Sequence, residues 1–555
     1  MLDRRTFLKT GLTMAGLSFP SGAQSAFSPS LVQDHDAAVV KLLERQVMDR
    51  GSPWFGGYPN ADGLVTPHSA AHLFEMLVSA YLCPQSRYHQ DGQIKRRIRH
   101  AVQHLETVQR ASGNIDLPTT NFNSPPDTGF VLRPLAGAAT LAKGFKSLEI
   151  LEWITPFLKK AGMALSRGGI HTPNHRWVVC SALAQLAALY PDEPYIERID
   201  QWLQEGVDID VDGMYTERST RVYNAVTNRS LVTMADKLNR PELLDPVRRN
   251  LDAMQYLLHA NGEVVTEISR RQDAHTRGDL RRYWFALRYM AIHDHSGPYA
   301  AMLLPYEPAH IQLPRLMEYP ILNQPLPQPE ELPSRFEKHF SAAGVTRIRD
   351  GSMSATLIHR DSSRFFSLHH GEAAIHAVRL ATAFFGKGQC VPEHYRHSDG
   401  QHIWRQTLKG PYYQPLEPSR RVPPNGDAWS LSRTERQASE ICTMHYELRL
   451  TRTDSGWELD MKADGTHRVP VSVEFNLREG GTMEGVEKVP GQDHAWLMQG
   501  GMASYTVGKD RMRFGPGGHE NRYVQVRGAM EKLSGPSVYI TSFTPFRQTI
   551  RFELL

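Results

Sequence analysis

The sequence predicts an α+β protein of two domains, in which an N-terminal α/α toroid of helical hairpins precedes a C-terminal antiparallel β-sandwich. Three observations favour this fold: helical periodicity in the first half, a proline-dense segment after it, and short alternating apolar runs in the remainder. A chain of 555 residues is also too long for one ordinary hydrophobic core.

The first residues are typical of an export signal. Arg4 and Arg5 precede Phe7 and a weakly apolar stretch, and small residues at 21–23 offer a cleavage site. We expect residues 1–23 to be a twin-arginine signal peptide, which implies the twin-arginine export machinery and a periplasmic or secreted protein. An amphipathic N-terminal helix is the alternative. No later segment approaches the roughly 18 to 20 apolar residues of a membrane span, so we expect no membrane anchor.

Helical periodicity extends over residues 30–304, which we take as the toroid. Apolar residues recur at steps of three and four in the stretches 37–47, 70–80, 98–108 and 179–186. Loops rich in Gly, Pro and Asn separate these stretches, as expected for stacked hairpins. One loop carries Trp54, which is suited to stacking on a sugar, although ordinary packing would use the same residue.

Residues 305–334 contain eight prolines, which prevent a long helix, and we interpret them as an interdomain linker. After them, alternating runs such as 345–348, 354–358, 446–450 and 471–475 predict the β-sandwich domain, residues 335–555.

Composition excludes some classes of protein. The formal net charge of +4 is small for this length and lacks the strong positive charge that is typical of nucleic-acid-binding domains. The four cysteines, Cys83, Cys180, Cys390 and Cys442, are far apart and form no CxxC pair, so free thiols are expected rather than a zinc ribbon. An oxidising periplasm would permit a disulfide without requiring one.

Two stretches combine groups that transfer protons or bind anions. Residues 168–177 contain Asn174, His175 and Arg176 after a Gly-Gly pair, and residues 212–223 contain two phenols and a carboxylate, Tyr215, Tyr223 and Glu217. Imidazole, phenol, amide and guanidinium groups beside glycine turns favour proton transfer on an anionic sugar.

The order of a helical-hairpin domain, a proline-rich segment and a β domain resembles the polysaccharide lyases of the chondroitin AC lyase and heparinase II/III type, over nearly the whole mature chain. Asn174-His175 at a helix start and the string Tyr215-x-Glu217-x-Ser219-x-x-x-Tyr223 resemble the places where that group keeps its catalytic His and Tyr. The resemblance implies cleavage of a uronic-acid-containing polysaccharide by β-elimination, with an acidic polysaccharide or oligosaccharide as substrate and no required cofactor.

Beta-elimination removes a poorly acidic C5 proton, so the neighbouring carboxylate must be neutralised. Asn123, Asn174 and Arg176 are the candidates for this role. Turn formation is the alternative for Asn123 and N-capping for Asn174. We expect His175 and Tyr223 to act as base and acid, in an order that the sequence leaves open; packing of a helix end and of a core aromatic are the alternatives.

Further residues are candidates for holding the substrate. Arg271 suits a uronate carboxylate, although a solvated helix face with internal ion pairs would explain most charges of the stretch 267–275. The β domain offers His370 and His394. His394 and His397 would also fit a metal site, but we expect no metal in the active site. The predicted substrate-binding residues are thus Arg176, Glu217, Tyr215, Arg271, Trp54, His370 and His394.

Two other functions fit parts of the sequence. A hydrolase of the unsaturated-uronyl type on the same toroid would need a carboxylate pair, for which Asp127 and Glu217 are available. A non-catalytic periplasmic glycan-binding protein would use the aromatic and arginine residues only to hold the polymer.

Overall fold

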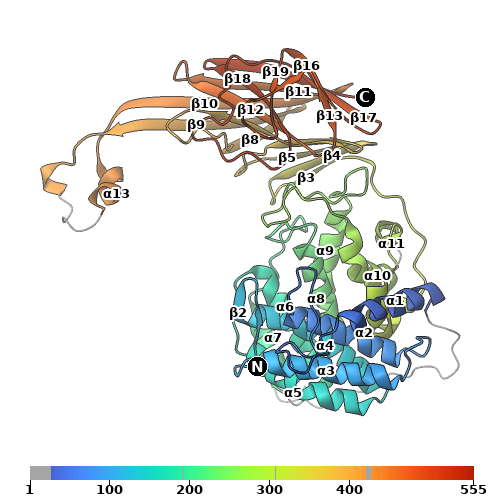
Figure 1. Cartoon of the computed structure of the whole chain (residues 1–555). Helices are drawn as coiled ribbons and strands as arrows, with labels where there is room; N and C mark the ends of the chain where they lie inside the picture. Colours follow the sequence, from blue (N-terminus) through green and yellow to red (C-terminus); the bar gives the residue numbers. More distant parts are fainter. Residues whose placement is uncertain (1–26, 192, 307, 421–426) are drawn as a thin grey trace, which may run out of the picture. The chain divides into compact units, whose positions relative to one another are not determined.

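The computed structural model describes residues 27–191, 193–306, 308–420 and 427–555 (Figure 1). The predicted signal peptide, residues 1–23, lies outside them. The chain divides into two compact units. The helical unit comprises Met1–Asp208, Ala225–Arg248 and Arg281–Glu331. The β unit comprises Ile209–Asn224, Arg249–Leu280 and Leu332–Leu555.

Helical hairpins form the first part of the helical unit, as the periodicity predicts. Each hairpin pairs two successive helices: α2 (Pro67–Leu82) with α3 (Gly92–Val108), α4 (Pro125–Gly144) with α5 (Leu148–Leu165), and α6 (Pro173–Leu189) with α7 (Tyr195–Gln204). In addition, α2 packs against α4 and α4 against α6, so one helix of each hairpin belongs to an inner row. Residues 73–80 of α2 are buried without interruption, whereas the buried residues of the outer α7 are Tyr195 and Ile199. A helix that is buried all round must be covered on every side, as in the inner ring of a toroid.

The other α-helices of the described residues are α1 (Pro29–Arg45), α8 (Tyr223–Leu238), α9 (Leu244–Met254), α10 (Trp284–His293), α11 (Gly297–Leu303), α12 (Leu313–Glu318) and α13 (Ala428–Ser432). A small two-stranded sheet, β1 (Ile115–Leu117) with β2 (Asn121–Ser124), precedes α4. No helix among the described residues is both long and apolar enough to cross a bilayer.

The proline-rich segment 305–334 differs from the bare linker that we expect from the sequence. It forms two single turns of 3-10 helix, η3 (His310–Gln312) and η4 (Pro320–Asn323), with α12 between them, and α12 packs against α2 and α4. Leu313 and Leu322 are buried. The prolines do shorten the helices, since α12 and η4 each carry Pro in their first turn, where its missing N–H is tolerated.

Two large sheets make up most of the β unit. Among the described residues, one sheet has nine strands in the order β14-β15-β18-β12-β7-β6-β5-β4-β3 and the other has eight in the order β13-β16-β17-β19-β11-β10-β9-β8. Neighbouring strands pair antiparallel, as predicted, except β15 and β18, which are parallel. The strands are β3 (Arg335–Phe340), β4 (Val345–Asp350), β5 (Met353–Ile358), β6 (Phe366–His370), β7 (Ala373–Thr382), β8 (His394–Ser398), β9 (Gln401–Tyr413), β10 (Ala438–Thr453), β11 (Gly456–Gly465), β12 (Pro470–Leu477), β13 (Thr482–Glu484), β14 (Val486–Lys488), β15 (Ala495–Met498), β16 (Gly501–Val507), β17 (Asp510–Gly517), β18 (Ser537–Phe543) and β19 (Phe546–Leu554).

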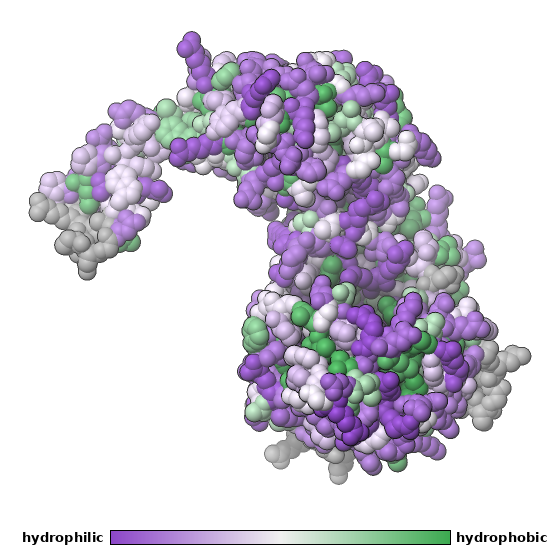
Figure 2. All heavy atoms as spheres, in the orientation of Figure 1, coloured by the Kyte–Doolittle hydropathy of each residue, from purple (hydrophilic) through white to green (hydrophobic). Residues whose placement is uncertain are grey.

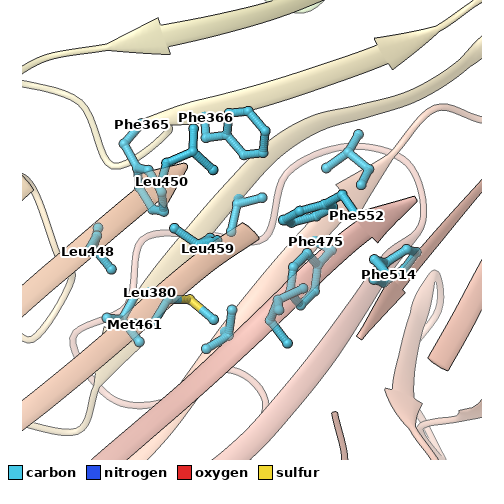
Figure 3. Packing of buried hydrophobic residues seen from close by; sticks show 14 of the residues in the cluster. Phe365, Phe366, Leu380, Leu448, Leu450, Leu459, Met461, Phe475, Phe514 and Phe552 are labelled. Atoms are coloured by element: carbon cyan, nitrogen blue, oxygen red, sulfur yellow. The ribbon is translucent and has the colours of Figure 1, made fainter. Parts of the chain in front are cut away.

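Aromatic rings from both sheets meet in the core of the sandwich (Figure 3). Phe475 of β12 lies 5.1 Å, centroid to centroid, from Phe514 of β17, and Phe366 of β6 lies 5.5 Å from Phe552 of β19. Such pairs add about 0.5–1.5 kcal/mol beyond the area that they bury. The visible outer surface of the sandwich is mostly hydrophilic (Figure 2), as alternation along each strand requires.

Replacing Phe552 with alanine should destabilise the β unit by about 3–5 kcal/mol, because the lost ring leaves a cavity between the sheets. Its side chain is 1% exposed. Phe543 of β18, the strand that precedes β19 in the chain, is 39% exposed, so Phe543→Ala is a matched control with an expected change within about 0.5 kcal/mol. Calorimetry of the full chain measures both, and equal unfolding temperatures for the two variants would contradict this account of the core.

The four cysteines are free thiols, as expected. Cys83, Cys180 and Cys390 are buried, and Cys442 is half-buried. Burial raises the pKa of the Cys83 thiol above its ordinary value, which is typical of inert structural cysteines.

Candidate active site

Two loops of the β unit are held together by Asp273. One loop, residues 213–222, precedes α8, and the other, residues 264–279, follows α9. Asp273 accepts hydrogen bonds from the Ser219 hydroxyl (2.9 Å), the Arg221 amide (3.2 Å) and the Ser269 hydroxyl (2.5 Å). Because Asp273 is buried, these bonds are shielded from water and fix the two loops against each other.

Tyr223 stands at the start of α8 and faces the second loop. Its amide donates to Ser219 Oγ at 2.9 Å, and its phenol donates to Gln272 Oε1 at 3.4 Å. The Arg271 guanidinium lies over the phenol ring, 5.0 Å from its centre, and Arg271 Nε lies 3.4 Å from Glu217 Oε1. The predicted residues Tyr223, Arg271 and Glu217 are therefore brought together, with a phenol and a cation side by side.

A pocket of about 630 Å³ opens beside the same loop. Its lining includes the loop residues His275 and Arg277, with His376, Arg364, Arg478 and Lys532 from the sandwich. Burial, followed by the positive charge of Arg364, lowers the pKa of His275 to about 3, and burial together with His369 lowers that of His376 to about 3. At neutral pH the pocket therefore presents two neutral imidazoles beside several cations, which suits an anionic ligand.

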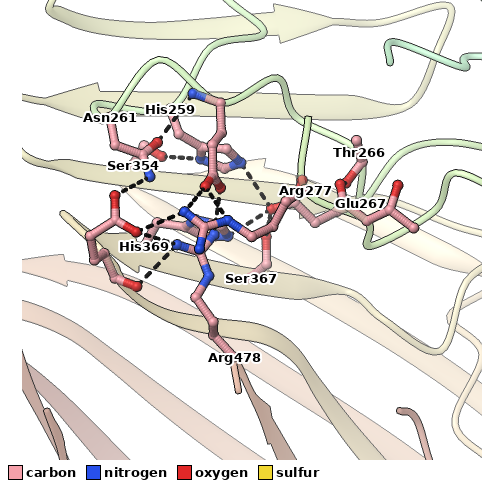
Figure 4. Close-up of polar contacts among 12 residues, drawn as sticks. His259, Asn261, Thr266, Glu267, Arg277, Ser354, Ser367, His369 and Arg478 are labelled. Carbon is pink, nitrogen blue, oxygen red and sulfur yellow. Dashed lines mark hydrogen bonds and ion pairs between the residues drawn. The ribbon is translucent and has the colours of Figure 1, made fainter. Parts of the chain in front are cut away.

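Two of these cations are neutralised within the protein (Figure 4). Arg478 pairs with Glu263 at 2.5 Å and with Glu372 at 3.3 Å, and Arg277 contacts the same two carboxylates. In the part of the chain that the structure describes, no ion pair engages Arg364. Lys532 donates hydrogen bonds to the carbonyls of Leu533 and Gly535, so Arg364 is the lining cation that is best placed to bind an anion.

A carboxylate and two imidazoles are buried in the β unit (Figure 4). Glu267 Oε1 lies 3.2 Å from His259 Nε2 and 2.9 Å from His369 Nε2, and the two rings stack with centres 3.7 Å apart. Burial acts to raise the pKa of Glu267, but the two histidines outweigh it and hold that pKa well below its ordinary value. Burial, followed by His259, lowers the pKa of His369 to about 4. The group is therefore a carboxylate that lies between two neutral histidines.

This arrangement corrects one interpretation of the sequence. The stretch 267–275 does not form a solvated helix face: it is a loop, and Glu267 and Asp273 within it are buried. Sequence reasoning also missed His259 and His376. Neither stands in a recognisable motif, because their partners lie far away in the chain.

Asn174 and His175 belong to the helical unit, in the first turn of α6. The N-cap of this helix is Thr172 rather than Asn174, and the buried Asn174 amide donates to Thr172 Oγ1 at 3.2 Å. The half-buried His175 ring packs edge-on against His171 (4.7 Å between centres) and Phe130 (6.0 Å). A catalytic role for these two residues stays a prediction.

Arg176 and Asn123 have partners within the helical unit. Arg176 pairs with Glu205 at 2.9 Å and with Asp208 at 2.8 Å, so binding a uronate would require these ion pairs to open. Asn123 accepts a hydrogen bond from the Ser112 hydroxyl at 2.5 Å and has a left-handed backbone with φ of 51°. That conformation agrees with the turn-forming alternative for Asn123.

The remaining predicted residues lie in different surroundings. Trp54 is 48% exposed, and its neighbours Pro53 and Phe55 line a separate hollow of about 720 Å³. Tyr215 is buried. On β6, His369 faces Glu267 while the next residue, His370, lies within 3.2 Å of the Ser352 hydroxyl, as alternation along a strand requires. His394 is exposed on β8.

No family model and no curated protein matches the sequence. The structure is similar to a crystal structure of heparinase III, at a TM-score of 0.56 and 12% identity over 98% of this chain and 94% of that one. It is also similar to the Streptomyces coelicolor A3 chondroitin AC lyase in complex with chondroitin sulphate. That match has a TM-score of 0.51 and 13% identity, over 96% of this chain and 78% of that one. The structure of Paenibacillus xanthan lyase matches at a TM-score of 0.51 and 10% identity, over 94% of this chain and 57% of that one. The chain therefore has the fold of these polysaccharide lyases, a helical toroid followed by an antiparallel β-sandwich.

Proposed function

We propose that this protein is a polysaccharide lyase that cleaves a uronic-acid-containing polysaccharide by β-elimination. The observation that carries the proposal is the Tyr223–Arg271 pair, in which a phenol and a guanidinium lie side by side on two loops fixed by Asp273. The fold, shared with solved lyases at low identity, supports the same class of reaction.

The residues of this pair match the two requirements of the reaction. A base removes the C5 proton, the electrons of that C–H bond form the C4–C5 double bond, and the C4–oxygen bond breaks as its oxygen receives a proton. Arg271 can balance the charge that develops on the uronate carboxylate as the C5 proton leaves. Tyr223 can exchange a proton with the substrate. Glu217, 3.4 Å from Arg271 Nε, would position the guanidinium.

The pocket lined by Arg364, Lys532, His275 and His376 supports an acidic substrate, because its two imidazoles are neutral and its cation Arg364 is engaged by no ion pair among the described residues. In the proposal it receives a second acidic group of the polymer. The elimination needs no cofactor, and we propose periplasmic action after twin-arginine export.

A panel of purified uronate polysaccharides, followed by absorbance in the near ultraviolet, tests the reaction class. Elimination leaves a C4–C5 double bond, so absorbance should grow on at least one polymer. New reducing ends without absorbance would indicate a hydrolase, for which Asp127 and Glu217 are the carboxylates to replace. Binding without either product would indicate a glycan-binding protein and reject the proposal.

The contacts described above assign no catalytic role to His175, Asn174 or Asn123, so variants must test whether these residues take part. Replacing each by alanine and measuring turnover on the polymer identified above shows which of them takes part. A retained rate in all three would exclude these residues from the chemistry.

A further inference from the structure

Histidines gather at one edge of the β unit, around Glu337. Glu337 and His339 lie two residues apart on β3, an edge strand of the nine-stranded sheet, so their side chains share one face. His397 lies on β8, an edge strand of the eight-stranded sheet, directly opposite His402 of β9. The cluster therefore brings together side chains from the edges of the two sheets.

Three imidazole nitrogens lie near one carboxylate oxygen. The Nε2 atoms of His339, His397 and His402 lie 3.3, 4.0 and 3.9 Å from Glu337 Oε1. Ligand atoms of Glu337, His339 and His397 all lie within 4.8 Å of one another. In a tetrahedral zinc site with bonds of about 2.0–2.1 Å, ligand atoms are about 3.3 Å apart. The observed spacing thus needs only a small contraction to surround an ion.

Hydroxyl groups lie within hydrogen-bond distance of the second ring nitrogen, Nδ1, of two of these histidines. His339 Nδ1 lies 2.8 Å from the buried Thr346 Oγ1, and His402 Nδ1 lies 2.7 Å from the Tyr395 hydroxyl. Thr346 can accept the Nδ1 proton of His339, which leaves the Nε2 lone pair directed at Glu337. Partners of this kind on the second ring nitrogen are typical of metal-binding histidines.

The buried group of His259, Glu267 and His369 is a poorer candidate for a metal. Its two histidine rings stack at 6° to each other, whereas the rings of His339 and His397 are tilted by 46°. All three residues are buried, which leaves no path for an ion to enter. In contrast, the side chains of Glu337, His339 and His397 are 41%, 42% and 34% exposed.

We propose that Glu337, His339 and His397 bind one divalent zinc-type ion, with water in the fourth position and the buried His402 as a neighbouring imidazole. Two imidazoles and a carboxylate form a ligand set that zinc accepts. Since the ligands come from β3 and β8, the ion would tie the edge of one sheet to the edge of the other. Binding to the folded state alone would then raise the unfolding temperature.

The test uses the full chain without a purification tag, stripped with a chelator and titrated with zinc chloride. We expect one zinc ion per chain, with saturable binding lost in His339→Ala and in His397→Ala. His394→Ala is the matched control, because His394 is an exposed histidine on the same strand, and it should retain the ion. Added zinc should raise the unfolding temperature of the wild type and of His394→Ala only.

Several results would overturn the proposal: no saturable zinc binding by the wild type, equal binding by all three variants, or loss of binding in His369→Ala with retention in His339→Ala. If an alanine variant does not fold, Glu337→Gln at the exposed carboxylate replaces it. Cobalt bound to the wild type gives an independent measure, because a visible spectrum typical of octahedral cobalt with water ligands alone would reject the site.

Discussion

Tyr223→Phe is expected to lower turnover by about 10²–10⁴-fold, the usual contribution of a positioned proton-transfer group. The variant removes one hydroxyl and keeps the ring, so the contact with the Arg271 guanidinium should survive. The hydroxyl makes only a long hydrogen bond to Gln272, at 3.4 Å, so we expect the unfolding temperature and the Michaelis constant to change little. Initial rates of absorbance growth on the polymer that the wild type cleaves measure the effect.

Tyr215→Phe is the control for this prediction. Tyr215 is the second phenol of the same loop, but it is buried, and we expect its variant to keep turnover within about threefold. A large loss in Tyr215→Phe with little loss in Tyr223→Phe would move the proton transfer to the other phenol. Equal binding of the polymer by wild type and Tyr223→Phe, without turnover in either, would favour the glycan-binding alternative.

The fold was largely predictable because its signals are local. Leu73, Leu77 and Ala80 recur on one side of α2, and alternating residues mark strands such as β5 and β12. The proline-rich segment was harder to interpret. Its prolines do prevent long helices, but Leu313 and Leu322 are buried in short helical turns that belong to the helical unit.

The candidate site was less predictable, because its contacts join distant parts of the chain. The proximity of Tyr223 to Glu267–His275 could not be read from spacing, since Asp273 reaches Ser219 across 54 residues. The charges of that stretch suggested solvent exposure, yet Glu267 is buried, with the Nε2 atoms of His259 and His369 3.2 and 2.9 Å from its carboxylate. Arg176 was predicted to bind the substrate, yet it forms ion pairs within the protein. Its carboxylate partners, Glu205 and Asp208, lie about one hairpin later in the sequence.

The buried histidines should make the β unit sensitive to acid. His369 binds its proton with a pKa of about 4 in the folded protein and near 6.5 when unfolded, because burial and then His259 disfavour its charged form. Between these two values the unfolded chain binds more protons, so the free energy of unfolding falls as the pH falls from 6.5 to 4. At about 1.4 kcal/mol per pKa unit, His369 alone accounts for a loss of about 3 kcal/mol. The lowered pKa of Glu267 adds a further loss below its ordinary value of 4.5, since the unfolded chain then takes up that proton too.

His369→Asn removes one titrating group from the interior while its amide can still donate to Glu267, so the dependence of unfolding free energy on pH should become shallower between pH 4 and 6.5. The slope should decrease by close to one bound proton over the middle of that window. His370→Asn, which changes the next residue on β6 beside Ser352, should keep the wild-type slope. Urea unfolding at closely spaced pH values measures all three proteins. Parallel curves for wild type and His369→Asn would mean that His369 is already protonated in the folded state, and that the carboxylate of Glu267 is balanced by a charged histidine instead of a neutral one.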